Sequence, residues 1–417
     1  MPAGTLRLLQ TWRLEKEQID MKVAFRTLAI AFGVLPALMF VSTATADEVV
    51  VNRGGGAGSP GDIGSVRPYR NPLAPPATAG VSAEARSATQ TGGVRHGTLA
   101  TSGAAPRAFG SFGLPFTSTR VATGASTAPR NSANYLATTF PYRPVGKLVF
   151  SAGYCSASVI LRGVIVTAAH CVQPFGAGSS LYSGFQFVPA HFAPGTTAAQ
   201  RAPYGTWTWA ALVRPASWAD GTDRGAGSAR DNDLAVIALG KNAAGKFVGD
   251  LTGVLGYAWN NYSFVSSPKT GNVAAAAVTT LGYPFLLDEG GRMQRSDGPA
   301  FLTTIKGAGQ IWQGSNFTGG SSGGPWVVNF RAANPSFDFG AGAGREADLA
   351  VIGVTSWGSD DPNPIKDNYS SQFRQNTRYP AASYGTYGGG NIGALLNTLC
   401  KKAAGGGKTY EQLGYCD

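Results

Sequence analysis

The chain has 417 residues, including 58 glycines and 25 prolines, and charged residues make up 14% of it. Glycine and proline are enriched, and charged residues fall well below the usual share of about 25%, which argues against coiled coils and helical bundles. No uninterrupted apolar stretch reaches the roughly 18 to 20 residues of a spanning helix, so a polytopic membrane protein is excluded. The net charge of +11 would suit a binder of anionic polymers, but the basic residues are scattered singly.

The N-terminal part of the chain carries an export pattern. Met21 and two basic residues precede the apolar run 28–41, and an Ala-Thr-Ala triplet follows at 44–46. This is the layout of a secretory signal peptide with an A-x-A cleavage site, and the run is too short for a membrane anchor. We therefore expect residues 1–20 to be an upstream start outside the fold and residues 21–46 to be a signal peptide. The mature protein is then secreted, into either the extracellular or the periplasmic space.

Residues 47–139 consist mainly of Gly, Ala, Ser, Thr and Pro with isolated arginines. Large apolar residues are sparse there and follow neither the helical nor the strand period, so the segment cannot bury enough surface to offset its ordering entropy. The composition predicts a disordered segment. It is either the removable pro-segment of a zymogen or a permanent linker, and the sequence leaves both open.

The composition of the chain changes at Phe140. Apolar stretches of strand length, rich in β-branched residues and bounded by Gly, Pro, Asn or Asp, follow at 147–150, 157–161, 163–167, 233–239, 326–330 and 349–355. Such stretches are typical of β-strands. They predict an all-β domain over residues 140–397, a length that suits two packed barrels with inserted loops. Residues 398–417 would form a C-terminal extension closed by a disulfide.

The chain has four cysteines, Cys155, Cys171, Cys400 and Cys416. An exported protein meets an oxidising compartment, where cysteines pair. Four cysteines allow three connectivities, and loop closure favours the two near pairs, Cys155 with Cys171 and Cys400 with Cys416. The alternative is a zinc site of four thiolates, which the absence of C-x-x-C spacing disfavours.

Candidates for a histidine base are few, because the chain has only His96, His170 and His191. His96 lies in the segment expected to be disordered, and His191 lies in a loop of Pro, Gly and Ala without a nearby polar constellation. His170 follows a predicted strand directly. A lone histidine there is more often structural than functional, but a disulfide through the adjacent Cys171 would hold it rigidly, as a base requires.

A glycine-rich loop surrounds Ser322 in the sequence 319–325, immediately before a predicted strand. Glycines there let backbone N–H groups point at one spot, where a negatively charged oxygen could develop. The alternative is a flexible Gly/Ser linker, but a linker would not run through Gly-Pro-Trp into Val-Val.

Two aspartates precede the predicted strand 233–239. Asp231 is expected to be a turn former, as acidic residues at strand starts usually are. Asp233 leads directly into Leu-Ala-Val, and can therefore carry its carboxylate to the edge of the core.

The sequences around His170, Asp233 and Ser322 resemble the chymotrypsin-like (trypsin-fold) serine peptidases. That family's fingerprints T-A-A-H-C, D-[IL]-A and G-D-S-G-G-P occur in the same chain order, over about residues 140–358. The resemblance implies two six-stranded antiparallel β-barrels with the active site in the cleft between them, and no metal or organic cofactor. It makes Ser322 the nucleophile, His170 the base and Asp233 the carboxylate that orients the imidazole, with an acyl-enzyme intermediate. The N–H groups of Gly320 and Ser322 would form the oxyanion hole.

The resemblance also implies a pocket for the side chain on the acyl side of the cleaved bond. Its residues would be Asn316 at the base, Phe317 beside it, and the strand Thr355, Ser356, Trp357 and Gly358 along one wall. A buried amide cannot offset the desolvation of a charged side chain. We therefore expect a small to medium neutral side chain, with Lys, Arg and Glu disfavoured, unless Asp360 or Asp361 folds back and supplies a negative charge.

The chain departs from the pancreatic members of that family at Ser321, where they carry the aspartate that receives the freed N-terminal ammonium. No I-V-G-G start precedes the domain either. The pattern is closer to the bacterial secreted branch that includes glutamyl endopeptidases. The histidine that those enzymes carry just before the tryptophan of the pocket strand is absent, so glutamate specificity is not expected.

Chain order excludes two other hydrolase folds. An α/β-hydrolase needs a histidine after its serine, and none follows Ser322. A subtilisin would need Asp47 or Asp62, from the segment expected to be disordered. A non-catalytic trypsin-fold surface-binding module remains as the alternative to a peptidase. As partners we expect polypeptide substrates, no nucleic acid, no stable membrane insertion after signal cleavage, and a monomer.

Overall fold

The computed structural model describes residues 48–51, 67, 110–121, 136–266, 268, 272–330, 349–359 and 365–417. All of them belong to one compact unit, Thr45–Asp417. The expected signal peptide, His96, Asp360 and Asp361 lie outside the described residues. Within the described ranges, no helix is long and apolar enough to cross a membrane.

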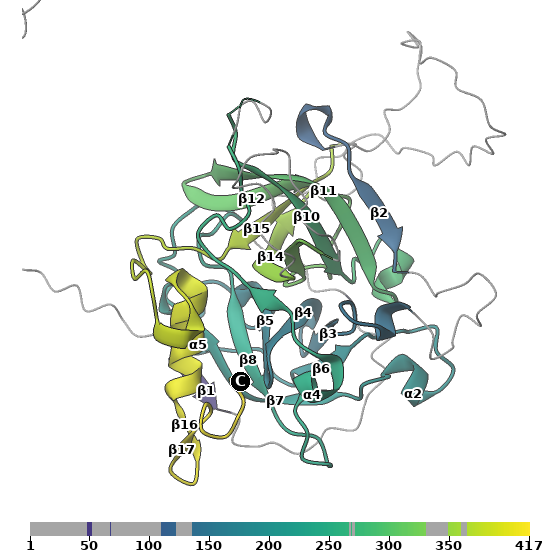
Figure 1. The fold of residues 1–417 in the computed structure, drawn as a ribbon, viewed down its shortest axis with the longest axis vertical. Helices are drawn as coiled ribbons and strands as arrows, with labels where there is room; N and C mark the ends of the chain where they lie inside the picture. Colours follow the sequence, from purple (N-terminus) through teal and green to yellow (C-terminus); the bar gives the residue numbers. More distant parts are fainter. Residues whose placement is uncertain are drawn as a thin grey trace, which may run out of the picture. The chain divides into compact units, whose positions relative to one another are not determined.

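The first barrel is a closed antiparallel sheet of six strands (Figure 1). Around the barrel the order is β7-β6-β3-β4-β5-β8, and pairing between β7 and β8 closes it. The strands are β3 (Val145–Phe150), β4 (Gly153–Leu161), β5 (Val164–Thr167), β6 (Gln186–Pro189), β7 (Trp207–Arg214) and β8 (Ala235–Leu239). Every residue of β5 and β8 is buried, which explains why these strands read as continuous apolar runs.

The second barrel repeats this plan later in the chain. Its order is β10-β13-β14-β15-β12-β11, and pairing between β10 and β11 closes it. The strands are β10 (Ala275–Gly282), β11 (Gln294–Ile305), β12 (Ala308–Gly314), β13 (Pro325–Val328), β14 (Ala350–Gly358) and β15 (Asp367–Gln372). The expected all-β fold of two six-stranded antiparallel barrels is therefore confirmed.

Helices are short and few among the described residues. The α-helices are α2 (Ala198–Arg201), α3 (Ala216–Ala219), α4 (Val248–Thr252) and α5 (Gly390–Lys401). The 3-10 turns are η2 (Ser111–Gly113), η3 (Leu136–Thr138), η4 (Ala169–Cys171), η6 (Asp288–Gly290) and η7 (Gly385–Tyr387). Three further short strands are β9 (Gly256–Tyr257), β16 (Ala403–Gly405) and β17 (Lys408–Thr409).

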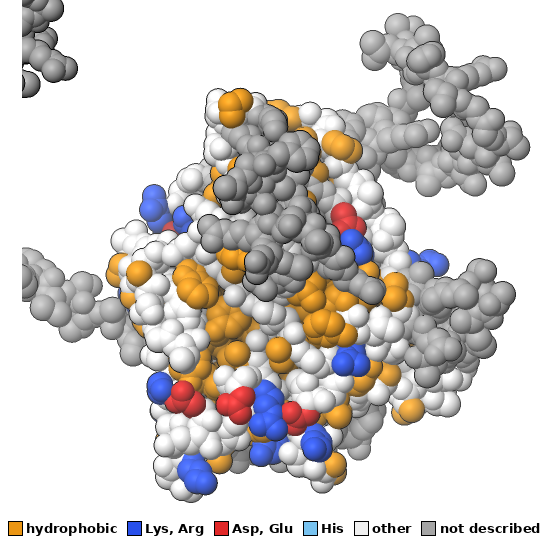
Figure 2. Space-filling view, in the orientation of Figure 1, with side chains coloured by type: hydrophobic (Ala, Val, Ile, Leu, Met, Phe, Trp, Pro, Cys, Tyr) orange, Lys and Arg blue, Asp and Glu red, His pale blue; other side chains and the backbone are white. Residues whose placement is uncertain are grey.

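On the face shown in Figure 2, Lys and Arg side chains lie among Asp and Glu and form no continuous basic surface.

Two strands and the 3-10 turns η2 and η3 lie within 47–139, where disorder was expected. Strand β1 (Glu48–Val51) pairs with the C-terminal half of β7, and β2 (Thr117–Arg120) pairs with the N-terminal half of β11. In each case the neighbouring barrel strand covers only the other half: β6 pairs with Trp207 and Thr208 of β7, and β12 begins its pairing at Ala300 of β11. The exposed half-edges leave backbone groups that an added strand can satisfy, and composition does not reveal them.

The C-terminal residues pack on the first barrel. Helix α5 contacts β7 and β8 and buries Ile392, Leu395, Leu396 and Leu399, which lie three or four residues apart on one face. The helix runs through residue 397, so the expected extension begins inside α5. Beyond α5 the chain returns to the turn between β4 and β5, where the N–H of Gly163 donates to the carbonyl of Tyr415 at 2.7 Å.

Candidate active site

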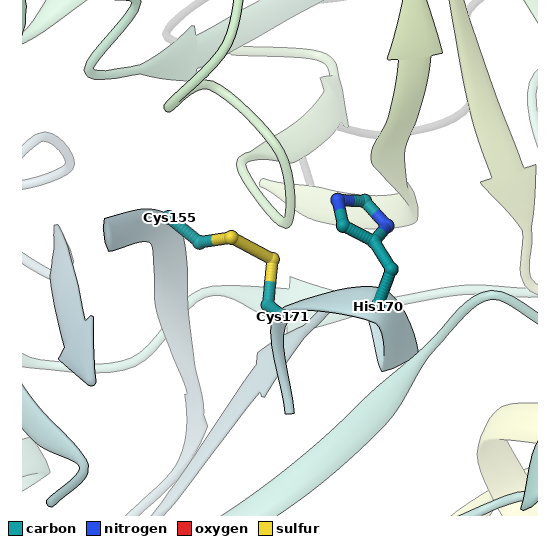
Figure 3. A group of neighbouring side chains, drawn as sticks. All are labelled: Cys155, His170 and Cys171. Carbon is teal, nitrogen blue, oxygen red and sulfur yellow. A yellow bond between two sulfur atoms is a disulfide. The ribbon is translucent and has the colours of Figure 1, made fainter. Parts of the chain in front are cut away.

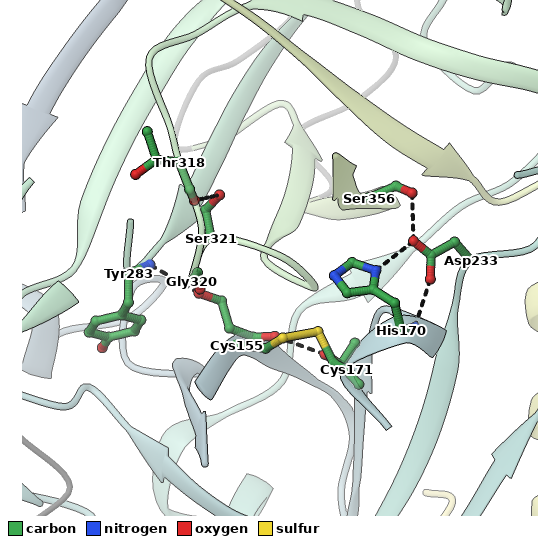
Figure 4. Close-up of a disulfide and its surroundings, with 11 residues drawn as sticks. Cys155, His170, Cys171, Asp233, Tyr283, Thr318, Gly320, Ser321 and Ser356 are labelled. Carbon is green, nitrogen blue, oxygen red and sulfur yellow. Dashed lines mark hydrogen bonds and ion pairs between the residues drawn. A yellow bond between two sulfur atoms is a disulfide. The ribbon is translucent and has the colours of Figure 1, made fainter. Parts of the chain in front are cut away.

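His170 and Asp233 lie side by side at one end of the first barrel. His170 is in η4, just after β5, and Asp233 comes just before β8. Since Thr167 and Ala235 are paired in these antiparallel strands, the two residues emerge at the same edge. His170 Nδ1 is 2.7 Å from Asp233 Oδ2, and the His170 backbone N–H donates to Asp233 Oδ1 at 2.9 Å (Figure 4). Both side chains are buried.

The second barrel supplies a further hydrogen bond to the carboxylate of Asp233. Ser356 on β14 donates its hydroxyl hydrogen to Asp233 Oδ2 at 2.5 Å. An ionised Asp233 accepts hydrogen bonds only, so the neutral imidazole carries its proton on Nδ1. Nε2 is then the ring nitrogen of His170 that carries no hydrogen and can accept a hydrogen bond.

The loop that carries Ser322 lies against the end of β5. The N–H of Gly323 donates to the carbonyl of Thr355 at 2.8 Å, and the carbonyl of Ser322 accepts from the N–H of Ser156 at 2.7 Å. Gly323 has a φ of 76°, and a Cβ atom there would lie 2.1 Å from Thr167 Oγ1. Only glycine permits this approach. The loop is thereby held beside the residues that lead into His170.

The turn before Ser322 is held in place by a hydrogen bond to the carbonyl of Gly320. Gly320 has a φ of 94°, and its carbonyl accepts from the hydroxyl of Ser156 at 2.9 Å. The Ser156 hydroxyl in turn accepts from the N–H of Tyr283 at 2.9 Å. Within the part of the chain that the structure describes, the N–H groups of Gly320 and Ser322 donate no hydrogen bond. They are therefore available to an oxygen of a ligand.

Ser321 replaces the pancreatic aspartate with a local contact. Its hydroxyl donates to the carbonyl of Thr318 at 2.7 Å, as Figure 4 shows. This contact closes the loop on itself.

The two near cysteine pairs are confirmed as disulfides, Cys155–Cys171 and Cys400–Cys416. The first links η4 to β4 next to His170 (Figure 3). Potential ligand atoms of Cys155, His170 and Cys171 lie within 4.8 Å of one another. Both sulfur atoms are bonded to each other, so neither is the thiolate that a metal ion requires. The group supports the position of His170 instead.

No protein-family model matches the chain, and no curated protein matches it. Solved structures do. The crystal structure of the thermostable serine protease AL20 from an extremophilic microorganism is 23% identical, with a TM-score of 0.41, over 56% of this chain and 92% of that chain. Protease Anisep from Arthrobacter nicotinovorans is 22% identical, with a TM-score of 0.41, over 57% and 93%. A Glu endopeptidase in complex with MPD is 16% identical, with a TM-score of 0.40, over 61% and 91%. These likenesses concern the fold.

The residues implied for the pocket divide into two groups. Thr355 Oγ1 accepts from Trp326 Nε1 at 3.0 Å, and Ser356 bonds Asp233, so both side chains have partners of their own. Trp357 stacks on Tyr369 with 3.9 Å between ring centroids. The two walls that the resemblance implies would then be Trp357 and Gly358, both partly exposed, and the segment of Asn316 and Phe317, which follows β12.

Sequence reasoning missed a polar network that fixes the chain beside Asp233. Asp223 Oδ2 accepts from the N–H of Asn232 at 2.8 Å, and Asn232 Oδ1 accepts from Asn376 Nδ2 at 2.7 Å and from Asn391 Nδ2 at 3.1 Å. Burial raises the pKa of Asp223. These asparagines stand alone in unrelated segments and follow no periodic pattern, so no signal in the sequence identifies them.

His191 was expected to have no nearby polar constellation, but it has polar neighbours, and its ring centroid is 6.1 Å from that of Tyr283. Its Nδ1 is 3.1 Å from the carbonyl oxygen of Arg201. Burial, with a contribution from the positive charge of Lys147, lowers the pKa of His191 to about 3. The imidazole is therefore neutral at physiological pH.

Proposed function

We propose that the protein is a secreted serine endopeptidase in which Ser322, His170 and Asp233 form the catalytic triad. The observation that carries this proposal is the buried pair of His170 and Asp233, joined by a 2.7 Å contact and lying beside the loop of Ser322. A buried carboxylate that fixes the tautomer of an imidazole is the arrangement that a general base for a serine needs.

The proposed reaction proceeds in two steps through an acyl-enzyme. Ser322 Oγ attacks the carbonyl carbon of the peptide bond while His170 Nε2 takes the hydroxyl proton. The oxyanion that forms accepts hydrogen bonds from the N–H groups of Gly320 and Ser322. His170 then gives the proton to the leaving amine, and the C–N bond breaks. A water molecule repeats the sequence on the ester and releases the acid.

Each group has a defined energetic role in this scheme. The negative charge of Asp233 stabilises the imidazolium that forms when His170 takes the proton, and its hydrogen bonds from Ser356 and the backbone of His170 keep it in place. One donor of an oxyanion hole is worth about 100-fold to 1,000-fold in turnover. The available N–H groups of the loop therefore favour a peptidase over the non-catalytic surface-binding module.

We also propose that the protein is exported after a signal peptide is removed. Export of the chain after removal of residues 21–46 is supported by the two disulfides, which persist in oxidising compartments. We propose polypeptide substrates, a monomer, and a domain of residues 140–397 with 398–417 attached.

Labelling with a serine-directed diphenyl phosphonate tests the proposal. We expect one adduct per chain, located on Ser322 by peptide mapping, and its loss in Ser322→Ala and His170→Ala. Ser383→Ala is the matched control, because it removes an exposed serine hydroxyl outside this loop and should still label. A folded wild-type chain without an adduct, or an adduct on another residue, contradicts the proposal and favours the binding module.

A further inference from the structure

Asn368 on β15 lies in the space between the two walls of the proposed pocket. It is directly opposite Gly358 in the β14–β15 pairing, and its side chain is buried. From that strand the side chain reaches across to the other wall: Nδ2 donates to the carbonyl of Ser315 at 3.0 Å and to that of Phe317 at 3.1 Å.

The amide of Asn368 fills the space beside Gly358. A Cβ atom built on Gly358 would lie 2.9 Å from Asn368 Cγ and 3.0 Å from its Oδ1. A substrate side chain lying along Gly358 would meet the same amide. Ser315 and Phe317 flank Asn316, so the amide spans the pocket at the level of the residue that the sequence suggested as its base.

The strand that carries Asn368 is tied on both sides. The N–H of Ser315 donates to the carbonyl of Lys366 at 3.0 Å, and the N–H of Ser359 donates to that of Asp367 at 2.8 Å. The carboxylate of Asp367 also accepts from the N–H of Ser111 at 2.9 Å. Removing the amide would leave the carbonyls of Ser315 and Phe317 without that donor in a buried site, which is unfavourable. The amide is therefore a fixed wall rather than a movable lid.

We infer that Asn368 closes the proposed specificity pocket and restricts the acyl-side residue of the substrate to glycine or alanine. This inference rests on the proposed function. It differs from the sequence-based expectation, in which Asn316 sets the specificity and medium-sized side chains also fit. Asn368 is a steric determinant here, because its two donor hydrogens are already committed and its amide occupies the space.

A series of peptidyl diphenyl phosphonates that differ only in the side chain at the reacting position tests the inference. The series carries the glycine, alanine, leucine, phenylalanine, lysine and glutamate analogues, and the readout is the second-order rate of Ser322 labelling in the full chain. For the wild type we expect the alanine probe to react at least about 100-fold faster than the phenylalanine probe, in line with the discrimination that pocket size provides.

Asn368→Gly and Asn368→Ser should raise the ratio of the leucine and phenylalanine rates to the alanine rate at least about 10-fold. Asn260→Ala is the matched control, since this exposed asparagine bonds Gln375 and its loss should not change the ratio. Asn316→Ala distinguishes the two asparagines, because it should shift the ratio less than Asn368→Ser. The serine variant keeps a hydroxyl donor should the glycine variant fail to fold.

The outcomes separate failure of this inference from failure of the proposed function. Rapid wild-type labelling by the leucine, phenylalanine, lysine or glutamate probe overturns the inference and leaves the proposed function standing. An unchanged ratio in folded Asn368→Ser overturns it as well. If no probe labels Ser322 in the wild type, the proposed function fails, and the inference fails with it.

Discussion

Asp231 forms an ion pair with Arg374, with 2.7 Å between Oδ1 and Nη2. The same oxygen accepts from the N–H of Gly309 at 2.7 Å, which connects the turn before β8 to the second barrel. Asp231 lies in a turn, as the sequence suggests, but it is also buried. Two residues further on, Asp233 points to His170 instead. Both aspartates contact the second barrel, but only Asp233 contacts the imidazole of His170.

The same substitution should therefore change a different property at each of the two positions. Asp233→Asn should lower kcat by about 10,000-fold, because the amide favours the wrong tautomer of His170. Asp231→Asn should lower the free energy of unfolding while leaving kcat of the folded protein within about 10-fold. Peptide hydrolysis and guanidinium unfolding measure the two quantities. The assignment of the aspartates is incorrect if Asp231→Asn has the larger effect on kcat.

The ion pair itself can be tested from its other partner. Arg374→Met should destabilise the protein by about 2 kcal/mol, less than the loss of a fully buried pair, because the Arg374 side chain is 27% exposed. The double variant Asp231→Asn with Arg374→Met should be more stable than the two single losses added together. Strict additivity in urea unfolding would mean that the two side chains do not interact.

His191 should make the protein sensitive to acid. Its pKa is about 3 in the folded chain because of burial, against an ordinary value of 6.5. The unfolded chain binds the extra proton first, so stability is full above pH 6.5 and falls as the pH drops towards 3. His191→Gln should remove up to about 5 kcal/mol of this pH dependence. Unfolding curves at several pH values measure it, and parallel profiles for both proteins would contradict the prediction.

Lys147 should act in a separate, alkaline window. It is buried, with its Nζ 3.7 Å from the centroid of the Tyr154 ring and 3.1 Å from the carbonyl oxygen of Gly290. Burial lowers the pKa of Lys147 from 10.5 to about 8. The unfolded chain holds its proton longer, so the contribution of Lys147 to stability rises as the pH increases from 8 to 10.5.

Lys147→Met tests this window. The variant should be more stable than the wild type at pH 7 by about 2 kcal/mol, because it removes the desolvation cost of a buried ammonium. The gain is not larger because the aromatic ring and the carbonyl offset part of that cost in the wild type. The stability difference between the two proteins should shrink towards pH 10. A difference that stays constant across this range would show that Lys147 does not titrate there.

Strand β2 should be protected although its composition is that of a disordered segment. Its backbone pairs with β11, and Arg120 forms an ion pair with Asp288. Hydrogen exchange of the full chain should show slow amides in Thr117–Arg120, and Arg120→Ala should speed their exchange. Complete exchange at the earliest time point would contradict the pairing.

The sequence determined the features that depend on short stretches of chain. Strand-length apolar runs located β4, β5 and β8, and the 16-residue separations of the cysteines favoured both disulfides. His170 and Ser322 stood out because a disulfide neighbour and a glycine-rich loop are local signals. These features need only nearby residues, so their pattern is visible before folding.

The tertiary structure decided which polar groups meet. Asn368 bonds Ser315, 53 residues away in the chain, and Asp231 bonds Arg374, 143 residues away. The pairing of β1 and β2 likewise depends on half-edges that exist only once the barrels have closed. Contacts between residues so far apart leave no period or spacing in the sequence, because each partner alone is an ordinary polar residue. These contacts form only when the two barrels bring the partners together.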